Sequence, residues 1–284
     1  MKHFFILLLL VVAVQASACD SLGISLQEGG LGDESPFRKT VSTGMVGATL
    51  GLSLVWAFDE WWKDNSHPFH FLSEGWFNDY SLGIDKLGHV YTSYFYFHTF
   101  RNMLLWGGHQ QSVATDWAAG SAAFFALCVE IGDGISPFGF SYEDFTANML
   151  GLGYGLLQVH VPFFKNFNLK WSYIPEPHYE SPLRFARYYD GHTYWLTCNV
   201  HNLLPSSLQN LWPEFLQVGV GYGVADSHTR RELVFSLDFN LEVFPVQNKE
   251  IRLLQQTVNM FHIPAPALKL IEGRSAEFLL IHKN

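Results

Sequence analysis

Hydrophobic and polar positions divide the chain into two regions of different periodicity. In the first, long apolar stretches cover residues 40–58, 85–106, 113–131 and 144–164, and each is longer than a typical strand. We therefore predict four helices. In the second, apolar residues from Leu233 to Val243 alternate with polar ones, which is the period of a strand. The predicted fold class is α+β, mainly an α-helical bundle of about four apolar helices, followed by a small antiparallel β-sheet with one helix.

The second region contains further predicted elements. Residues 192–200 and 216–224 have strand character, and the polar connector 225–232 would join the latter strand to the alternating run as a hairpin. Residues 249–261 have the pattern of an amphipathic helix, and residues 278–282 that of a final short strand. We expect a small sheet that packs with this helix.

The start of the chain has the pattern of a secretion signal. Lys2 supplies a positive charge, residues 4–14 are apolar, and residues 16–18 form a small-residue cleavage site. Cys19 follows directly, so one interpretation is a lipoprotein acylated at Cys19, and the other is ordinary cleavage after residue 18. The chain is therefore predicted to consist of a signal peptide, a polar tether, a helical bundle and a C-terminal aromatic-rich α+β region, at residues 1–18, 19–39, 40–165 and 166–284.

The composition favours a membrane-associated or envelope protein. Charged residues make up only 15% of the chain, below the roughly 25% expected of soluble domains. The net charge of −9 argues against nucleic-acid binding. Residues 145–164 are long enough to span a bilayer, whereas 87–100 and 117–129 are short, so a membrane-embedded bundle and a lipid-tethered bundle both remain open. Cys128 and Cys198 are interpreted as buried free thiols, with a disulfide as the alternative in an oxidising compartment.

Polar residues interrupt the apolar helices at three places. They are Asp85-Lys86-x-x-His89, Glu130-x-x-Asp133 and Ser141-x-x-Asp144-x-x-x-Asn148. Short connections make consecutive helices antiparallel, so the start of the second helix, the end of the third and the start of the fourth would meet. Ionisable groups are costly in an apolar bundle unless they find partners. We therefore predict that the three groups converge.

The predicted cluster allows three roles for His89. With Glu130 and Asp133 it offers nitrogen and oxygen ligands of the type that zinc or manganese accepts, so a divalent metal is the cofactor that these residues suggest. As a general base it would have Glu130 and Asp144 as carboxylate partners, with Lys86 stabilising anionic charge. In the third role it is a buried histidine that is hydrogen-bonded to a nearby carboxylate.

Ser141 and Asp144 also have the spacing of a helix-capping pair. Ser141 would accept a backbone N–H at the start of the fourth helix, and Asp144 would reach back. Capping would explain these two residues without any chemistry. It does not explain Asn148, which lies farther along the same helix face. Gly151, one turn later, is interpreted as a position of close helix packing.

These residues, in this order, resemble two known groups. The sequence is similar to the YfiM-like envelope lipoproteins, whose pattern is Asp-Lys-x-x-His, a later Glu, and Ser-x-x-Asp opening a helix that carries a later Gly. It resembles VanZ-like membrane proteins more distantly. The matching residues are Asp85, Lys86, His89, Glu130, Asp133, Ser141, Asp144, Asn148 and Gly151. The resemblance covers residues 40–165 and implies a bacterial cell-envelope protein, without an enzymatic mechanism.

Two functional interpretations follow. In the first, the protein is an envelope lipoprotein or membrane-associated bundle that the polar network holds together. In the second, it is a membrane-surface enzyme that acts on a lipid-linked or cell-wall substrate by acid–base or metal-assisted chemistry. Solvent access to the polar residues distinguishes the two interpretations, because an active site needs an open pocket, whereas a structural network should be sealed. Membrane lipid and other envelope proteins are the expected partners.

Overall fold

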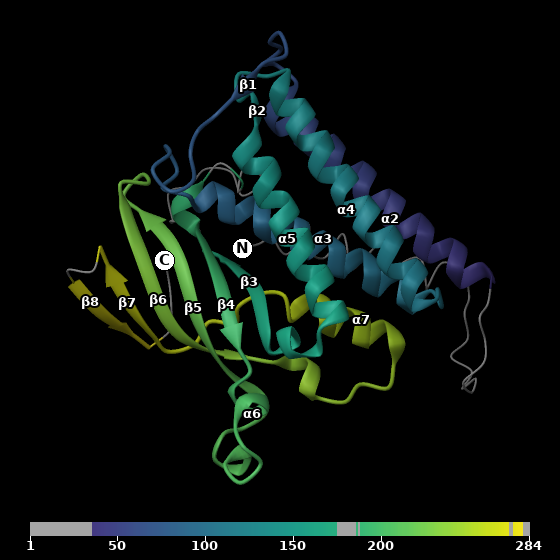
Figure 1. Cartoon of the computed structure of the whole chain (residues 1–284), viewed down its shortest axis with the longest axis vertical. Coiled ribbons are helices and arrows are strands. Elements are labelled where there is room, and N and C mark those ends of the chain that lie inside the picture. The colour runs from purple at the N-terminus through teal and green to yellow at the C-terminus, as the bar shows by residue number, and fades with distance from the viewer. Residues whose placement is uncertain (1–35, 175–185, 187, 273–274, 281–284) are drawn as a thin grey trace.

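Four long helices form one side of the molecule, and a sheet forms the other (Figure 1). The computed structural model describes residues 36–174, 186, 188–272 and 275–280. The helices are α2, Pro36–Ala57; α3, Ile84–Trp106; α4, Gln111–Gly134; and α5, Tyr142–His160. Short loops join α3 to α4 and α4 to α5. The start of α3, the end of α4 and the start of α5 therefore lie at one end of the bundle, as predicted.

The ends of two helices differ from the prediction. Helix α2 begins at Pro36, inside the segment that was expected to be a tether, because proline fits the first turn of a helix. It continues into one π-helical turn, η1, at Phe58–Trp62. Helix α5 ends at His160 and not at residue 164, since Pro162 cannot continue a regular helix. Residues Pro162–Asn166 form a 3-10 helix, η2.

The bundle core brings α3 very close to α5. Phe97, Phe100 and Met103 of α3 are almost fully buried in this core. At Gly151 of α5, a Cβ atom would lie 1.9 Å from the carbonyl oxygen of Val90, so only glycine permits this crossing. The predicted close packing at Gly151 is confirmed, and it holds the polar residues of α3 and α5 in register.

Fewer helices than expected have the character of a membrane span. About four helices were predicted as candidates, but among the described residues two are long and apolar enough, Pro36–Trp62 and Gln111–Gly134. These two helices qualify by their length and composition, which the core helix of a soluble protein or a signal sequence can share. Cys128, on the second of these helices, and Cys198 have free thiols and are half-buried, which corrects the expectation of buried thiols.

The sheet is larger than predicted. Its six strands form an antiparallel meander in the order β3-β4-β5-β6-β7-β8. A separate parallel pair joins β1 to β2 near the helix ends. The bounds are β1, Phe71–Leu72; β2, Phe140–Ser141; β3, Phe167–Tyr173; β4, His192–Cys198; β5, Leu216–Ala225; β6, Arg230–Phe239; β7, Ala267–Ile271; and β8, Ser275–Leu279.

The predicted hairpin is confirmed as β5 and β6, with one correction at its end. Strand β6 stops at Phe239, and Leu241–Val243 form a 3-10 helix, η6, although their sequence continues the alternation. Asn240 causes the change, because its side-chain oxygen accepts the backbone N–H of Glu242 at 3.1 Å. Strands β3 and β7 were not predicted, and β8 begins three residues before the expected range of 278–282.

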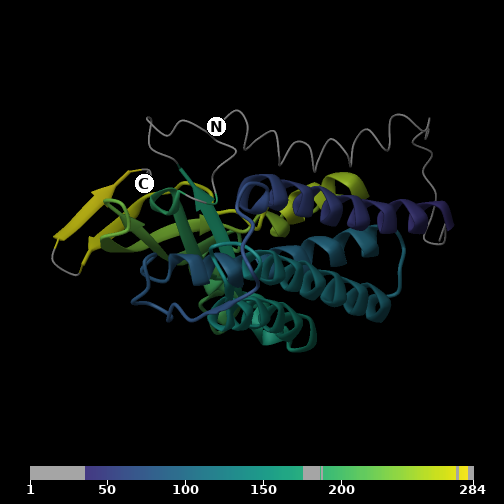
Figure 2. The same cartoon turned by 90° about the horizontal axis from the view of Figure 1, so that it is seen from above.

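Short helices complete the fold. Helix α6, Val200–Leu203, follows β4, so the strand predicted over 192–200 ends two residues early. Helix α7, Lys249–Val258, is the predicted amphipathic helix, shortened by three residues. It lies against the helical layer beside α2 (Figure 2), where Arg38 pairs with Glu250 at 2.9 Å.

The inner face of the sheet contains a buried charged group, which we call the sheet triad: Lys170, Asp238 and His262. The Asp238 carboxylate lies 2.6 Å from the Lys170 ammonium and 3.2 Å from Nδ1 of His262. All three side chains are at most 1% exposed. Trp195 stacks on His262 with ring centroids 3.8 Å apart. The triad is thus sealed from solvent.

Candidate functional site

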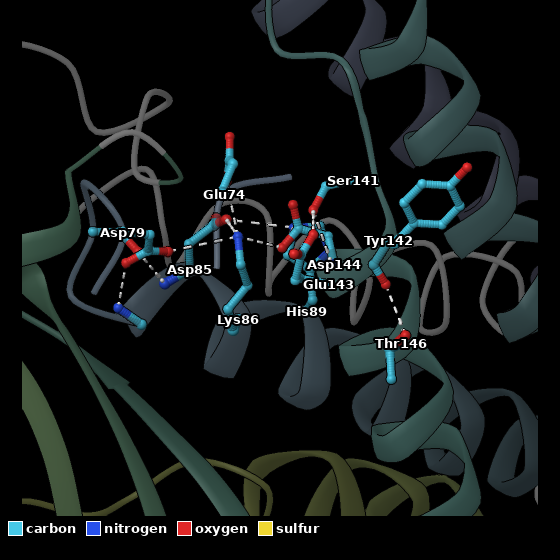
Figure 3. A network of polar contacts seen from close by, with 12 residues as sticks. Glu74, Asp79, Asp85, Lys86, His89, Ser141, Tyr142, Glu143, Asp144 and Thr146 are labelled. Atoms are coloured by element: carbon cyan, nitrogen blue, oxygen red, sulfur yellow. Dashed lines mark hydrogen bonds and ion pairs between the residues drawn. The ribbon is translucent and has the colours of Figure 1, made fainter. Parts of the chain in front are cut away.

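Charged side chains of α3 and α5 gather with those of the loop that precedes α3 (Figure 3), and the end of α4 adds two more carboxylates. We call this group the helix-end cluster. It consists of Glu74, Asp79, Asp85, Lys86, His89, Glu130, Asp133, Asp144 and Asn148. The predicted convergence of the three sequence groups is confirmed, because His89 lies 3.6 Å from Glu130 and 3.9 Å from Asp144.

Lys86 is the centre of the helix-end cluster. Its ammonium lies 2.7 Å from Asp144, 2.9 Å from Glu74, 3.3 Å from Asp85 and 3.6 Å from Asp79. The side chain is only 2% exposed. Burial alone would lower the pKa of Lys86, but the charges of Asp85 and Asp144 outweigh it and raise this pKa above its usual range. Lys86 is therefore a permanent buried cation.

His89 lies beside this centre and reaches solvent. Its Nε2 atom is 3.9 Å from both Asp85 and Asp144, and its side chain is 18% exposed. Its Nδ1 atom is 3.1 Å from the amide nitrogen of Asn148. Burial would lower the pKa of His89, but the carboxylates of Asp144, Asp85 and Glu130 outweigh burial and raise the pKa to about 9.

Asn148 links all three helices. Its amide nitrogen donates to Glu130 at 3.0 Å, and its oxygen accepts from the Ser93 hydroxyl at 2.8 Å. Glu130 is 1% exposed, and burial raises its pKa to about 8. The amide of Asn148 thus fixes the Nδ1 side of His89, while the Nε2 side faces Asp85 and Asp144.

Asp133 points to a different partner. Its carboxylate accepts the indole N–H of Trp62 at 2.8 Å. Burial raises the pKa of Asp133 to about 7, although the hydrogen bond from Trp62 opposes this shift. Asp133 is therefore held at the edge of the helix-end cluster by the turn that follows α2.

The predicted capping role is confirmed for Ser141 but not for the side chain of Asp144. Its hydroxyl accepts the backbone N–H of Asp144 at 3.2 Å and caps α5. The carboxylate of Asp144 does not reach back, because it forms an ion pair with Lys86. The neighbouring Glu143 instead contacts Ser141, and it also accepts the hydroxyl of Ser73 at 2.5 Å. The capping interpretation was therefore wrong for the Asp144 side chain.

Three cluster contacts were missed in the sequence. Glu74 and Asp79 lie in the loop before α3, which has no periodic pattern. Asp79 accepts the backbone N–H of Gly83 at 2.7 Å, but Gly83 is itself the N-cap residue of α3, so no capping spacing marks Asp79 in the sequence. Tyr189 is distant in sequence and donates to Asp85 at 2.9 Å, a contact that no local spacing reveals.

A possible ligand set for a metal ion differs from the predicted one. Within the described part of the chain, the ligand atoms of Asp85, His89 and Asp144 all lie within 4.8 Å of one another. The sequence suggested His89 with Glu130 and Asp133 instead. That set is not the one assembled, because Glu130 is engaged by Asn148 and Asp133 by Trp62.

Comparison with known proteins gives one family match. Residues 73–160 match the model of a family described as "Predicted periplasmic lipoprotein (DUF2279)". The matched segment contains every member of the helix-end cluster. Searches of curated proteins and of solved structures found no match.

The match supports the coarser part of the sequence prediction. It supports an exported envelope location and a lipoprotein domain of unknown function over less than half of the chain. The YfiM-like and VanZ-like relationships remain resemblances. Cys19 lies outside the described residues, so its acylation remains a prediction.

Proposed function

We propose that the protein is an envelope lipoprotein, acylated at Cys19, whose helix-end cluster is a divalent-cation centre. The observation that carries this proposal is the grouping of Asp85, His89 and Asp144 within 4.8 Å. One nitrogen and two carboxylate oxygens form a donor set that zinc and manganese accept. The side chains of Asp85 and His89 are 17% and 18% exposed, so this group is partly open to solvent.

The charge balance of the cluster supports a cation. Six carboxylates surround Lys86 and His89, and His89 would have to release its proton to bind a metal ion. Burial raises the pKa of Glu130 and of Asp133, so those two carboxyl groups tend toward the neutral form. The carboxylates around Lys86 still outnumber it, and a divalent cation would offset their repulsion.

The arrangement suits metal-assisted chemistry on a lipid-linked envelope substrate. A bound divalent cation would polarise a phosphoryl or ester oxygen. Asn148 would orient His89 through its contact with Nδ1, and Tyr189 would orient Asp85 by donating its hydroxyl to that carboxylate. Lys86 is too deeply buried to contact substrate, so its role is to hold the carboxylates together.

A second candidate function is a purely structural network. The contacts of Lys86 favour it, because one buried ammonium bound by several carboxylates joins α3, α5 and the preceding loop without any ligand. In this alternative, substitution of His89 lowers stability, and added cations have no specific effect.

Cation titration separates the two candidates. We expect Mn²⁺ or Zn²⁺ to bind with a stoichiometry of one and to raise stability, by about 2.7 kcal/mol at a concentration of 100 Kd. Asp85→Asn and His89→Gln should lower the affinity at least about tenfold. Asp133→Asn is the matched control and should leave affinity within about twofold, because Trp62 already occupies that carboxylate. A cation effect that is absent in the wild type, or equal in all four proteins, would rule out the cation centre.

A further inference from the structure

The six-stranded sheet has the opposite polarity from a sheet in a typical soluble protein. Its buried face carries the sheet triad and a second ion pair, Lys269 to Glu232 at 2.7 Å. On β6, Glu232 and Asp238 are buried, whereas Leu233 and Phe235 on the opposite face are exposed. Antiparallel sheets with one solvated face normally show the reverse arrangement, apolar inside and polar outside.

The exposed and half-buried apolar side chains of this opposite face form continuous rows across the strands. Strand register places one row of five apolar residues from β4 to β8. All five residues are exposed. The row is Leu196, Val220, Phe235, Leu268 and Phe278. Flanking rows on the same face are Cys198, Val218 and Leu237, and Tyr222, Leu233, Leu270 and Ala276. We call these twelve residues the outer sheet face. Tyr194 of β4 continues the second flanking row to the point where the sheet packs against Tyr91 of α3, and the exposed face ends there.

We propose that the outer sheet face inserts into one leaflet of a lipid bilayer. Its composition distinguishes lipid from a protein partner. The twelve residues are aliphatic or aromatic except for Cys198, and hydrogen bonding is limited to Cys198 and the hydroxyl of Tyr222. Protein interfaces of standard size carry about ten hydrogen bonds and are enriched in arginine. A face made of Leu, Val, Phe and Ala fits hydrocarbon better.

The dimensions fit one leaflet. From Leu233 to Leu237, the apolar band rises four residues, or about 13 Å at roughly 3.3 Å per residue. That is about half of a hydrocarbon core of roughly 30 Å. The predicted anchor allows this contact, because Cys19 is 17 residues before Pro36, a chain length of at most about 60 Å.

Aromatic residues border the outer sheet face on the side of the helix-end cluster. The Tyr222 hydroxyl donates to the backbone oxygen of Leu82 at 2.6 Å, in the loop that leads into α3. Trp76, Phe77 and Tyr80 of the same loop are exposed. Tryptophan and tyrosine favour the membrane–water interface. Insertion would therefore bring the helix-end cluster to the level of lipid headgroups, where a lipid-linked substrate could reach it.

This inference rests on the proposed envelope location and not on the cation centre. The test uses the chain expressed from its full sequence with Cys19→Ser, so that no acyl anchor contributes. Flotation with phosphatidylethanolamine–phosphatidylglycerol vesicles should recover this protein. A second protein that also carries Val220→Thr, Phe235→Thr and Leu268→Thr should bind about tenfold more weakly or less. Threonine retains strand propensity, and circular dichroism with a melting curve confirms folding.

Two controls make the result specific. Leu211→Thr removes an exposed apolar side chain outside the sheet and should leave vesicle binding unchanged. Phe235→Trp should add fluorescence that lipids with brominated acyl chains quench, whereas Leu211→Trp should add fluorescence that they do not. Equal flotation of the triple variant and the Leu211 control would overturn the proposal. So would a dimer in solution that the triple variant dissociates, because the face would then bind a second copy.

Discussion

The helix-end cluster and the sheet triad both bury charged side chains, but they differ in charge balance and exposure. In the sheet triad, the Asp238 carboxylate lies between Lys170 and His262, and all three side chains are at most 1% exposed. In the helix-end cluster, six carboxylates share Lys86 and His89, and the exposure of His89 reaches 18%.

The difference indicates what each group can do. A sealed group with matched charges needs no further ligand, and its members are strongly interdependent because no water can replace a lost partner. A group with surplus negative charge and an opening to solvent can accept a cation. The comparison favours a structural role for the sheet triad and supports the proposal that the helix-end cluster binds a cation.

The largest expected effect is at the sheet triad. Asp238→Asn removes the carboxylate and leaves the Lys170 ammonium buried without its counter-charge. We expect the free energy of unfolding to fall by about 3–5 kcal/mol, measured by urea denaturation. Asp59→Asn is the control, because its ion pair with Lys63 is exposed and should contribute little to stability. Similar losses in the two variants would show that the sheet triad is not a sealed ion pair.

Lys86→Met tests the corresponding centre of the helix-end cluster. We expect a loss of about 3 kcal/mol in the free energy of unfolding, smaller than at Asp238 because Glu74 and Asp85 reach solvent and can be hydrated. A divalent cation should restore much of this loss, and the urea transition should move back when Mn²⁺ is added. No cation should restore Asp238→Asn. Recovery of both variants, or of neither, would remove the distinction between the two groups.

The sequence allowed the helix-end cluster to be predicted in part. His89, Glu130 and Asp144 could be placed together because helix period and short loops fix which ends meet. Glu74 and Asp79 could not, since their loop has no period. The sequence suggested Glu130 and Asp133 as metal partners of His89, whereas the structure groups His89 with Asp85 and Asp144, because contacts such as that of Asp133 with Trp62 are not encoded in spacing.

The sheet was predicted less completely than the bundle. The β5–β6 hairpin has ten residues in each strand and was recognised, whereas the shorter β3 and β7 were missed. Strand β3 does alternate apolar and polar residues, so that signal was available. The polarity of the sheet could not be predicted, because alternation gives two faces without saying which one is buried.

A pH titration of stability sharpens the comparison further. Burial alone would raise the pKa of Asp238, but the hydrogen bond with His262 and the charge of Lys170 outweigh it and hold this pKa below its ordinary 3.8. A carboxyl group with a lower pKa in the folded chain stabilises the fold above its unfolded pKa and loses that contribution as pH falls through the folded value. We therefore expect stability to fall below about pH 4.

Comparing variants shows whether Asp238 causes the loss of stability at acid pH, which we call the acid limb. Asp238→Asn should show a shallower decrease than the wild type between about pH 4 and pH 2, because it lacks the titrating carboxyl group. Asp59→Asn should follow the wild type. Calorimetric melting curves at several pH values give the measurement, and parallel acid limbs in the wild type and Asp238→Asn would contradict the assignment.

The smallest expected effect separates helix capping from charge in the helix-end cluster. Ser141 caps α5 through the backbone N–H of Asp144, whereas the carboxylate of Asp144 pairs with Lys86. Ser141→Ala should therefore cost about 1 kcal/mol of stability and leave cation affinity within about twofold. Ser141→Asp restores a capping acceptor but adds a charge, so Ser141→Thr is the better control and should recover most of the stability. If Ser141→Ala instead lowered cation affinity about tenfold, the cap would be needed to position Asp144, and capping and charge would act as one unit.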